Sequence, residues 1–337
     1  MQVSSWNSTA PLSSPRYAAL QKEPKAEIHI HVGGAFPPAY LRTIASEDQR
    51  RELDVFLERI KQRIDYEDVF AVFPLISRIV DTNKKIEDGA FHICEELKSD
   101  GVRVVELRST LKTLDGKDEE TYLKALLEGI NRSTTEDFTA SILLSIKRDS
   151  SAEFVKTTVD LALKYKSQGV VGIDISGVST TGDIGMHLPI LKEAKDQGLF
   201  ISAHIGESYD ETDQMDILQQ LEPHRIGHGV CLAADAIEWI KEHKIPVEVC
   251  LTSAKLVKMH EMDSLHPWLL AHKEEGHPIV LCTDDPTVFG VSLTDEYYGL
   301  LKEALINGSH PIFECFHPIN QKTVRTLLSR VCDLTVF

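Results

Sequence analysis

The chain has 337 residues, a formal net charge of −16 at pH 7, 42% hydrophobic residues and 26% charged residues. This composition predicts a packed globular protein, and the acidic balance without clustered Lys and Arg argues against a nucleic-acid-binding surface. No apolar run reaches the roughly 18 residues of a membrane-spanning helix, and the N-terminus lacks the apolar segment of a signal peptide. We therefore expect a cytosolic monomer that acts on a small molecule, and we expect its six dispersed cysteines to be reduced.

The N-terminal part of the chain combines a polar arm with a strand that carries two histidines. Residues 1–22 are rich in Ser, Asn and Pro without periodicity, which predicts a flexible arm before a single domain over residues 23–337. Residues 26–32 alternate apolar and polar side chains, so a strand here places His29 and His31 on one face. Two such imidazoles can bind one transition-metal ion, although two polar residues facing solvent would show the same pattern.

The segment after this first strand is predicted to be helical. Pro37 and Pro38 can open a helix, and residues 46–66 place Leu and Ile at helical spacing. We expect several helices within residues 37–99 before the next strand.

The rest of the chain alternates β-rich runs with amphipathic stretches of helical spacing. The seven further runs are 102–109, 139–147, 170–177, 200–207, 225–230, 246–253 and 278–285. The helical stretches between them include 119–132, 152–166, 188–197 and 233–243. Eight such units predict an α/β protein with a closed (β/α)8 TIM barrel and extra helices after strand 1. No Gly-x-Gly-x-x-Gly turn follows the first strand, which argues against a dinucleotide-binding fold.

In such barrels the chemistry lies at the carboxyl ends of the strands, and here these ends are polar. Three imidazoles and one carboxylate from three of these ends could bind one metal ion with a position left open for water. These residues are His29, His31, His204 and Asp284. The sequence contains no Cys-x-x-Cys pair, which would be the signal of a structural zinc site. Residues 170–177 contain no lysine that could bridge two metals, so we predict a single ion.

Seven short motifs at these strand ends are together similar to the adenosine/AMP deaminase family, in particular to its branch that acts on N6-methyl-AMP. The resemblance runs from Pro24 to about Ala304. Its motifs are PKAEIHIH (24–31), VELRST (105–110), GIDISG (172–177), HIGE (204–207), RIGHG (225–229), CLTS (250–253) and LCTDDP (281–286).

The resemblance implies hydrolytic deamination of a 6-aminopurine, with one zinc ion bound by the four residues above. It implies that Glu207 protonates purine N1 while water adds to C6, and that His228 orients this water. Asp285 is implied to contact N7, and the backbone N–H of Gly177 to contact N3. The ordinary alternatives are a solvated carboxylate for Glu207, a core histidine for His228 and a turn glycine for Gly177. The resemblance also implies that Asp174 and Ser253 contact the metal ligands and hold them in position.

The sequence departs from the adenosine deaminases at a position that bears on the substrate. Gly33 stands where those enzymes have an aspartate, whose charge would repel a phosphate. This favours N6-methyl-AMP as the substrate, with IMP and methylamine as products; adenosine is the alternative. Ser109, Thr110 and Lys112 could donate to the phosphate, although plain surface residues would also occur there.

Other departures leave a third interpretation open. Residues 178–180 and 254 differ from the usual family pattern, and the sequence after Ile306 does not follow the closing helices of the family. A purine-binding protein without activity would fit these changes, as would an altered final turn of the barrel. Retention of Glu207 and of every metal ligand argues against that interpretation. The metal also stays open, because His and Asp can bind iron, cobalt or manganese.

Overall fold

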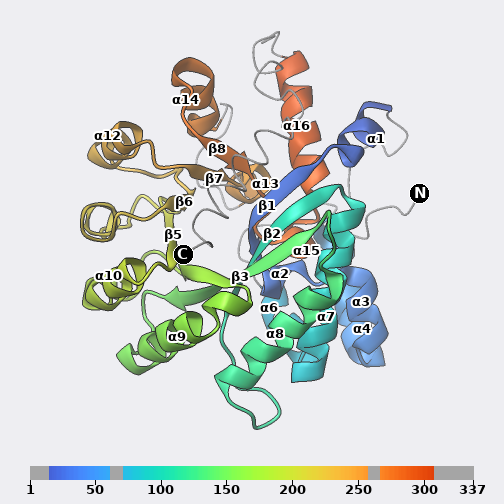
Figure 1. The fold of residues 1–337 in the computed structure, drawn as a ribbon. Helices are drawn as coiled ribbons and strands as arrows, with labels where there is room; N and C mark the ends of the chain where they lie inside the picture. The colour runs from blue at the N-terminus through green and yellow to red at the C-terminus, as the bar shows by residue number, and fades with distance from the viewer. Residues whose placement is uncertain (1–14, 61–70, 257–265, 307–337) are drawn as a thin grey trace.

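The computed structural model describes residues 15–60, 71–256 and 266–306. Eight parallel strands hydrogen-bond in the order β1 to β8 and curl into a nearly closed barrel that helices surround (Figure 1). The strands are β1 (Lys25–His31), β2 (Val102–Thr110), β3 (Thr139–Lys147), β4 (Val170–Ser176), β5 (Phe200–Ile205), β6 (Arg225–His228), β7 (Val247–Val249) and β8 (Ile279–Leu281). The predicted TIM barrel is confirmed.

The helices between the strands begin where the amphipathic pattern predicted them. Ser151 caps α9 because its hydroxyl accepts the backbone N–H of Phe154, and Asp118 caps α8 in the same way. The α-helices are α1 (Pro15–Lys22), α2 (Val32–Ala35), α3 (Pro38–Ile44), α4 (Glu47–Ile60), α6 (Val72–Ile79), α7 (Asn83–Ser99), α8 (Glu119–Ser133), α9 (Ala152–Lys164), α10 (Leu188–Asp196), α11 (Gln214–Asp216), α12 (Ala234–His243), α13 (Leu251–Leu256), α14 (Pro267–Glu275), α15 (Pro286–Phe289) and α16 (Leu293–Ile306). Shorter helical turns are η1 (Lys166–Gln168), η2 (Ile184–Met186) and η3 (Ile217–Leu221).

The barrel closes between β1 and the segment that follows β8. The N–H of Asp284 donates to the carbonyl of His29, and the N–H of His31 donates to the carbonyl of Asp284, both at 2.9 Å. Below them the buried carboxylate of Glu27 accepts the N–H of Thr283 at 3.0 Å and its hydroxyl at 2.7 Å. Closure therefore brings two histidines of the first strand beside the carboxylate that follows the last.

Several predicted boundaries differ from the structure; the run predicted as a strand over 278–285, for example, is a strand only over β8. Residues 15–22 form helix α1 rather than part of a flexible arm, because Tyr17 is buried and the ammonium of Lys25 donates to the carbonyl of Leu20 at 2.8 Å. The run predicted as a strand over 246–253 is a strand only as far as β7, and α13 begins two residues later. Residues 1–14 and the sequence after Ile306 lie outside the described residues.

The cysteines within the described part of the chain are free thiols in buried positions, as expected: Cys94, Cys231, Cys250 and Cys282. Across the same residues, none of the helices combines the length and the apolar character that crossing a membrane requires.

Candidate active site

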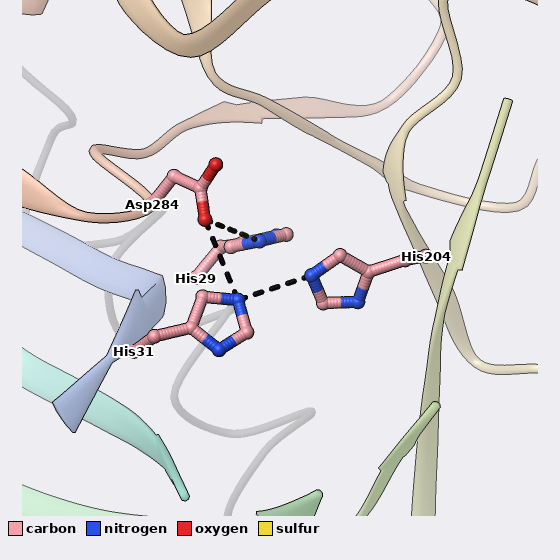
Figure 2. A group of neighbouring side chains, drawn as sticks. All are labelled: His29, His31, His204 and Asp284. Atoms are coloured by element: carbon pink, nitrogen blue, oxygen red, sulfur yellow. Dashed lines mark hydrogen bonds and ion pairs between the residues drawn. The ribbon is translucent and has the colours of Figure 1, made fainter. Parts of the chain in front are cut away.

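The four predicted metal ligands converge at the carboxyl end of the barrel (Figure 2). One ligand atom from each lies within 4.8 Å of the others. The Nε2 atoms of His31 and His204 are 3.1 Å apart, and the Oδ1 atom of Asp284 lies 3.4 Å from Nε2 of His31 and 3.5 Å from Nε2 of His29. Strands β1 and β5 and the end of β8 thus supply the donor set that the sequence predicted.

The tautomers in this cluster suit a metal ion. The Nδ1 atom of His29 donates to the carboxylate of Glu248 at 2.8 Å, and Nδ1 of His204 donates to the carbonyl of Ile175 at 2.9 Å. Each bond leaves the Nε2 lone pair directed into the cluster. The Nε2 atom of His29 is buried without a hydrogen-bond partner among the described residues, and burial lowers the pKa of His31 to about 3. Neutral imidazoles with converging lone pairs are the donors that a divalent metal requires.

Two residues at the site adopt the left-handed backbone conformation that non-glycine residues rarely use. They are Asp284, with φ 64°, and His228 at the end of β6, with φ 63°. The hydroxyl of Ser253 donates to Oδ2 of Asp284 at 2.7 Å and fixes its side chain. Strained residues persist where the surrounding structure imposes them, and they cluster at functional sites.

Glu207 and His228 lie beside the metal cluster. The Nε2 atom of His228 is 3.7 Å from Oε1 of Glu207, and the centre of its ring is 4.9 Å from that of His29. Burial raises the pKa of Glu207 and lowers the pKa of His228 well below its usual range. Oε2 of Glu207 and Nδ1 of His228 are buried without a partner among the described residues, so both can bind a ligand.

Asp285 is held at the same rim by a close approach of the backbone. A Cβ atom on Gly34 would collide with the Asp285 carboxylate, so only glycine fits there. The Oδ1 atom of Asp285 is buried and unpartnered within the described chain. Burial, and after it the charges of Asp284 and Glu207, raise the pKa of Asp285 well above its usual range.

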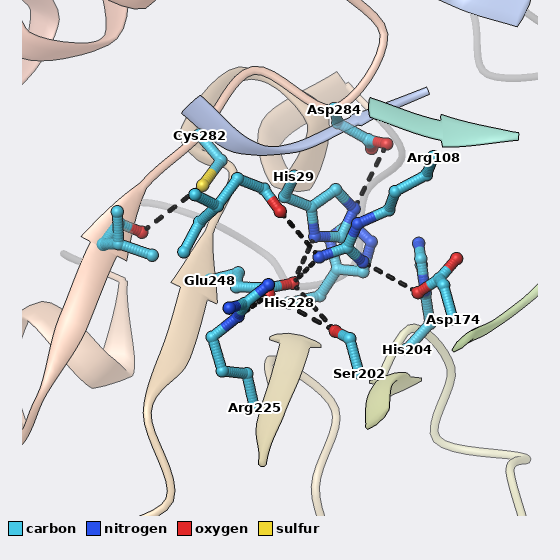
Figure 3. A network of polar contacts seen from close by, with 12 residues as sticks. His29, Arg108, Asp174, Ser202, His204, Arg225, His228, Glu248, Cys282 and Asp284 are labelled. Atoms are coloured by element: carbon cyan, nitrogen blue, oxygen red, sulfur yellow. Dashed lines mark hydrogen bonds and ion pairs between the residues drawn. The ribbon is translucent and has the colours of Figure 1, made fainter. Parts of the chain in front are cut away.

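A buried ionic network lies directly behind the metal cluster (Figure 3). Arg108 donates to Asp174 at 2.8 Å and also to Glu248, and Arg225 donates to Glu248 at 2.6 Å. Asp174 lies 3.2 Å from Nδ1 of His204. Arg108 thereby connects the carboxylates that contact two different metal ligands.

Asp174 was among the residues predicted from the sequence, whereas Arg108 and Glu248 were not. The available signal was a charged residue within an apolar strand. Lys, Arg and Glu are almost never fully buried unless they are paired, so the glutamate in Val247-Glu248-Val249 and the arginine in VELRST indicated internal partners.

The remaining residues predicted to contact the substrate lie in different environments. The prediction that Ser109 contacts the phosphate is corrected by the structure, because the buried hydroxyl of Ser109 lies 2.7 Å from the hydroxyl of Tyr122 on the helix side of β2. Thr110 is the last residue of β2 and is partly exposed. Gly33 lies in α2, where a Cβ atom would meet only Phe73, at 3.9 Å. Gly177 follows β4 with φ 84°, a conformation that favours glycine.

The barrel and its donor set are those of a metal-dependent hydrolase with a TIM-barrel fold. The family model for adenosine deaminase matches residues 24–310. The chain belongs to the adenosine deaminase family and is a metal-dependent purine deaminase.

The similarity to known proteins extends over most of the chain. The N6-mAMP deaminase of Arabidopsis thaliana is 34% identical over 310 residues, which cover 82% of this chain and 86% of that protein. The N6-methyl-AMP deaminase of Danio rerio is 32% identical over 330 residues, which cover 90% and 94%. A solved structure of Arabidopsis ADAL complexed with IMP matches with a TM-score of 0.76 at 30% identity and covers 84% of this chain and 87% of that one.

Proposed function

We propose that the protein is a zinc-dependent deaminase that converts N6-methyl-AMP and water to IMP and methylamine. The observation that carries the proposal is the convergence of three imidazoles and Asp284 beside Glu207, whose Oε2 atom is buried without a hydrogen-bond partner among the described residues. The names of the two relatives above, and the IMP bound to the Arabidopsis neighbour, support the choice of nucleotide. We further propose that residues 23–337 form one catalytic domain.

The donor set suits zinc, which binds imidazole and carboxylate ligands in sites that keep one position open. His29, His31, His204 and Asp284 would hold the ion. When bound, such an ion lowers the pKa of water so that a nucleophile is available near neutral pH.

Glu207 and His228 would donate and accept the protons of the reaction. The raised pKa of Glu207 keeps a proton on its carboxyl group, which can protonate purine N1 as the water oxygen bonds to C6. His228 would hold the attacking water by a hydrogen bond. The proton that the attacking water loses would pass to His228, which lies 3.7 Å from Glu207 and would restore the carboxyl proton given to N1. Once C6 carries both substituents, its hydroxyl group would give its proton to N6 as the C6–N6 bond breaks, and methylamine would leave.

Asp285 and Gly177 would orient the base. Purine N7 is a hydrogen-bond acceptor, so Asp285 can bind it only as a protonated carboxyl, which its raised pKa favours. The backbone N–H of Gly177 would donate to N3. These two contacts lie on opposite edges of a purine, so together they fix the position of C6 relative to Glu207.

The test is turnover of N6-methyl-AMP, AMP and adenosine by protein whose metal content is measured on the same sample. We expect the fastest release of the 6-substituent from N6-methyl-AMP, with one zinc per chain. Glu207→Gln should lower kcat by about 100- to 10,000-fold without loss of the metal. Equal or faster turnover of adenosine would establish the nucleoside as substrate instead. Fully metallated protein that turns over none of the three would support a binding function.

A further inference from the structure

A cluster of buried polar side chains lies beside the metal site and has no role in the chemistry proposed above. Arg148 follows β3, and Glu211, Asp213 and Gln214 belong to the segment that leads from β5 into α11. Arg148, Glu211 and Gln214 are all buried. Side chains of these types are rarely buried without specific partners. Here their partners include the backbone of the loops that carry the catalytic residues.

Arg148 connects two carboxylates to the backbone of a predicted metal ligand. Its Nε atom donates to Asp213 at 2.8 Å, and its Nη2 atom donates to Glu211 at 2.9 Å. The Nη2 atom also donates to the carbonyl of His204 at 2.9 Å. Because β4 lies between β3 and β5 in the sheet, the arginine side chain passes the end of β4 to reach this carbonyl.

Glu211 holds the next peptide of the same segment. Its Oε1 atom accepts from Arg148, and its Oε2 atom accepts the N–H of Gly206 at 2.7 Å. Together Arg148 and Glu211 therefore bind both peptides that flank Ile205. The chain between the predicted ligand and Glu207 is fixed by side-chain contacts on either side.

This segment is also bound to the loop that follows His228. The carbonyl of Gly206 accepts the N–H of Val230 at 3.1 Å and the N–H of Cys231 at 2.7 Å. The backbone just before Glu207 and the backbone just after His228 are thus joined by hydrogen bonds.

Gln214 reinforces this link. Its Nε2 atom donates to the carbonyl of Cys231 at 2.9 Å, and its Oε1 atom accepts the N–H of Ala233 at 2.9 Å. Gln214 follows Glu211 by three residues. One short segment of the chain therefore binds the loop after β5 and the loop after β6.

The proposed chemistry requires these two loops to keep their spacing. The Nε2 atom of His228 lies 3.7 Å from Oε1 of Glu207, and both side chains must reach one bound purine. Glu207 follows directly after the residue whose N–H is bound by Glu211. A displacement of about 1 Å in a catalytic group can lower the rate about 100-fold, so the contacts that fix this backbone bear on the rate as well as on the fold.

We propose that Arg148 and Glu211 are positioning residues, which hold the backbone of Glu207 in the place relative to His228 and the metal ligands that deamination requires. The proposal rests on the proposed function, because the roles of Glu207 and His228 belong to it. The hydrogen bonds of Arg148 and Glu211 go to each other, to Asp213 and to the backbone, so both residues act through Glu207.

The test is steady-state kinetics of Arg148→Met and Glu211→Gln with the substrate that the wild type turns over fastest, and with kcat expressed per bound metal ion. Each variant should lower kcat about 10- to 100-fold and change KM by less than about threefold, because the contacts position a group that acts in the transition state. Arg148→Lys keeps the charge but lacks the planar fork of donors. Its kcat should lie between those of Arg148→Met and the wild type.

A double variant separates positioning from stability. Arg148→Met leaves Glu211 buried without its cationic partner, whereas Arg148→Met combined with Glu211→Gln removes both halves of the pair. The Tm of the double variant should therefore exceed that of Arg148→Met, while its kcat should be no higher. A kcat that recovered together with the Tm would show a merely structural role. If Arg148→Met does not fold, the isosteric Glu211→Gln variant alone decides the question.

The matched control is Arg132→Met. Arg132 also pairs with two carboxylates, Glu87 at 2.9 Å and Asp88 at 2.7 Å, but this group joins the outer helices α7 and α8. The control should leave kcat and KM unchanged.

Three results would overturn the positioning role while turnover by the wild type upheld the proposed function. They are an unchanged kcat per metal ion in both Arg148→Met and Glu211→Gln, a raised KM with an unchanged kcat, and an equal loss of kcat in the control. A fully metallated wild type that turns over none of N6-methyl-AMP, AMP and adenosine would refute the proposed function and the positioning role together.

Discussion

Replacing Glu248 by Gln should weaken both the fold and the metal site, because one buried carboxylate serves both. Glu248 accepts from Arg108, from Arg225 at 2.6 Å and from Nδ1 of His29 at 2.8 Å. Breaking a buried ion pair typically costs about 3–5 kcal/mol. Arg108 keeps its bond to Asp174 in the variant, so we expect the lower end, a loss of about 3 kcal/mol in the free energy of unfolding.

The same substitution should lower the affinity for the metal. A charged acceptor behind a ligating histidine fixes its tautomer and raises its basicity, and loss of such an acceptor costs about 10- to 100-fold in metal affinity or activity. Urea denaturation of the metal-free protein measures the first effect, and competition with a chromophoric chelator measures the second. Glu242→Gln, at an exposed position on α12, is the control. If Glu248→Gln matched this control in both assays, the positioning role of Glu248 would be wrong.

Three further predictions concern other parts of the molecule. Gly34→Ala should displace the Asp285 carboxylate and lower kcat/KM about 100-fold with the metal content unchanged, as measured by steady-state kinetics and elemental analysis. Lys25 is 3% exposed, and burial lowers its pKa from 10.5 to about 8. The folded state therefore binds fewer protons than the unfolded state between these values, and the stability of the wild type relative to Lys25→Met should rise by about 3 kcal/mol from pH 8 to pH 10.5 in urea titrations. Removal of the metal with a chelator should abolish turnover and lower the Tm, and added zinc should restore both; turnover that survives complete metal removal would contradict the assigned chemistry.

The barrel could be predicted because its local signals agree with its topology. Alternating β-rich runs and capped amphipathic helices, such as those that begin after Asp118 and Ser151, leave few arrangements open. The boundary at β7 could not be predicted in this way. The residues from Cys250 to Ser253 have a β-rich composition, but α13 begins at Leu251, and Glu296 accepts the N–H of Thr252 at 3.1 Å. That partner lies 44 residues away in the chain, so no local pattern could indicate it.

The candidate site could be predicted only where the residue types themselves indicate a chemical role. Histidines and carboxylates at strand ends indicate a metal, which is why the donor set could be named. The direction of Ser109 could have been inferred from strand periodicity, because it alternates with the inward-facing Arg108. The left-handed conformation of His228 could not, because histidine, although enriched among the non-glycine residues that adopt it, does so in only a small fraction of cases.

Closure of the barrel and assembly of the metal site depend on the same backbone contacts. Asp284 exchanges hydrogen bonds with His29 and His31 through its main chain, while its side chain completes the cluster that these two histidines begin. Its left-handed conformation costs about 1–2 kcal/mol, and the two backbone bonds offset this cost only when β1 and β8 meet. The ligand geometry therefore forms together with the closed barrel, and a bound metal ion in turn stabilises that closure.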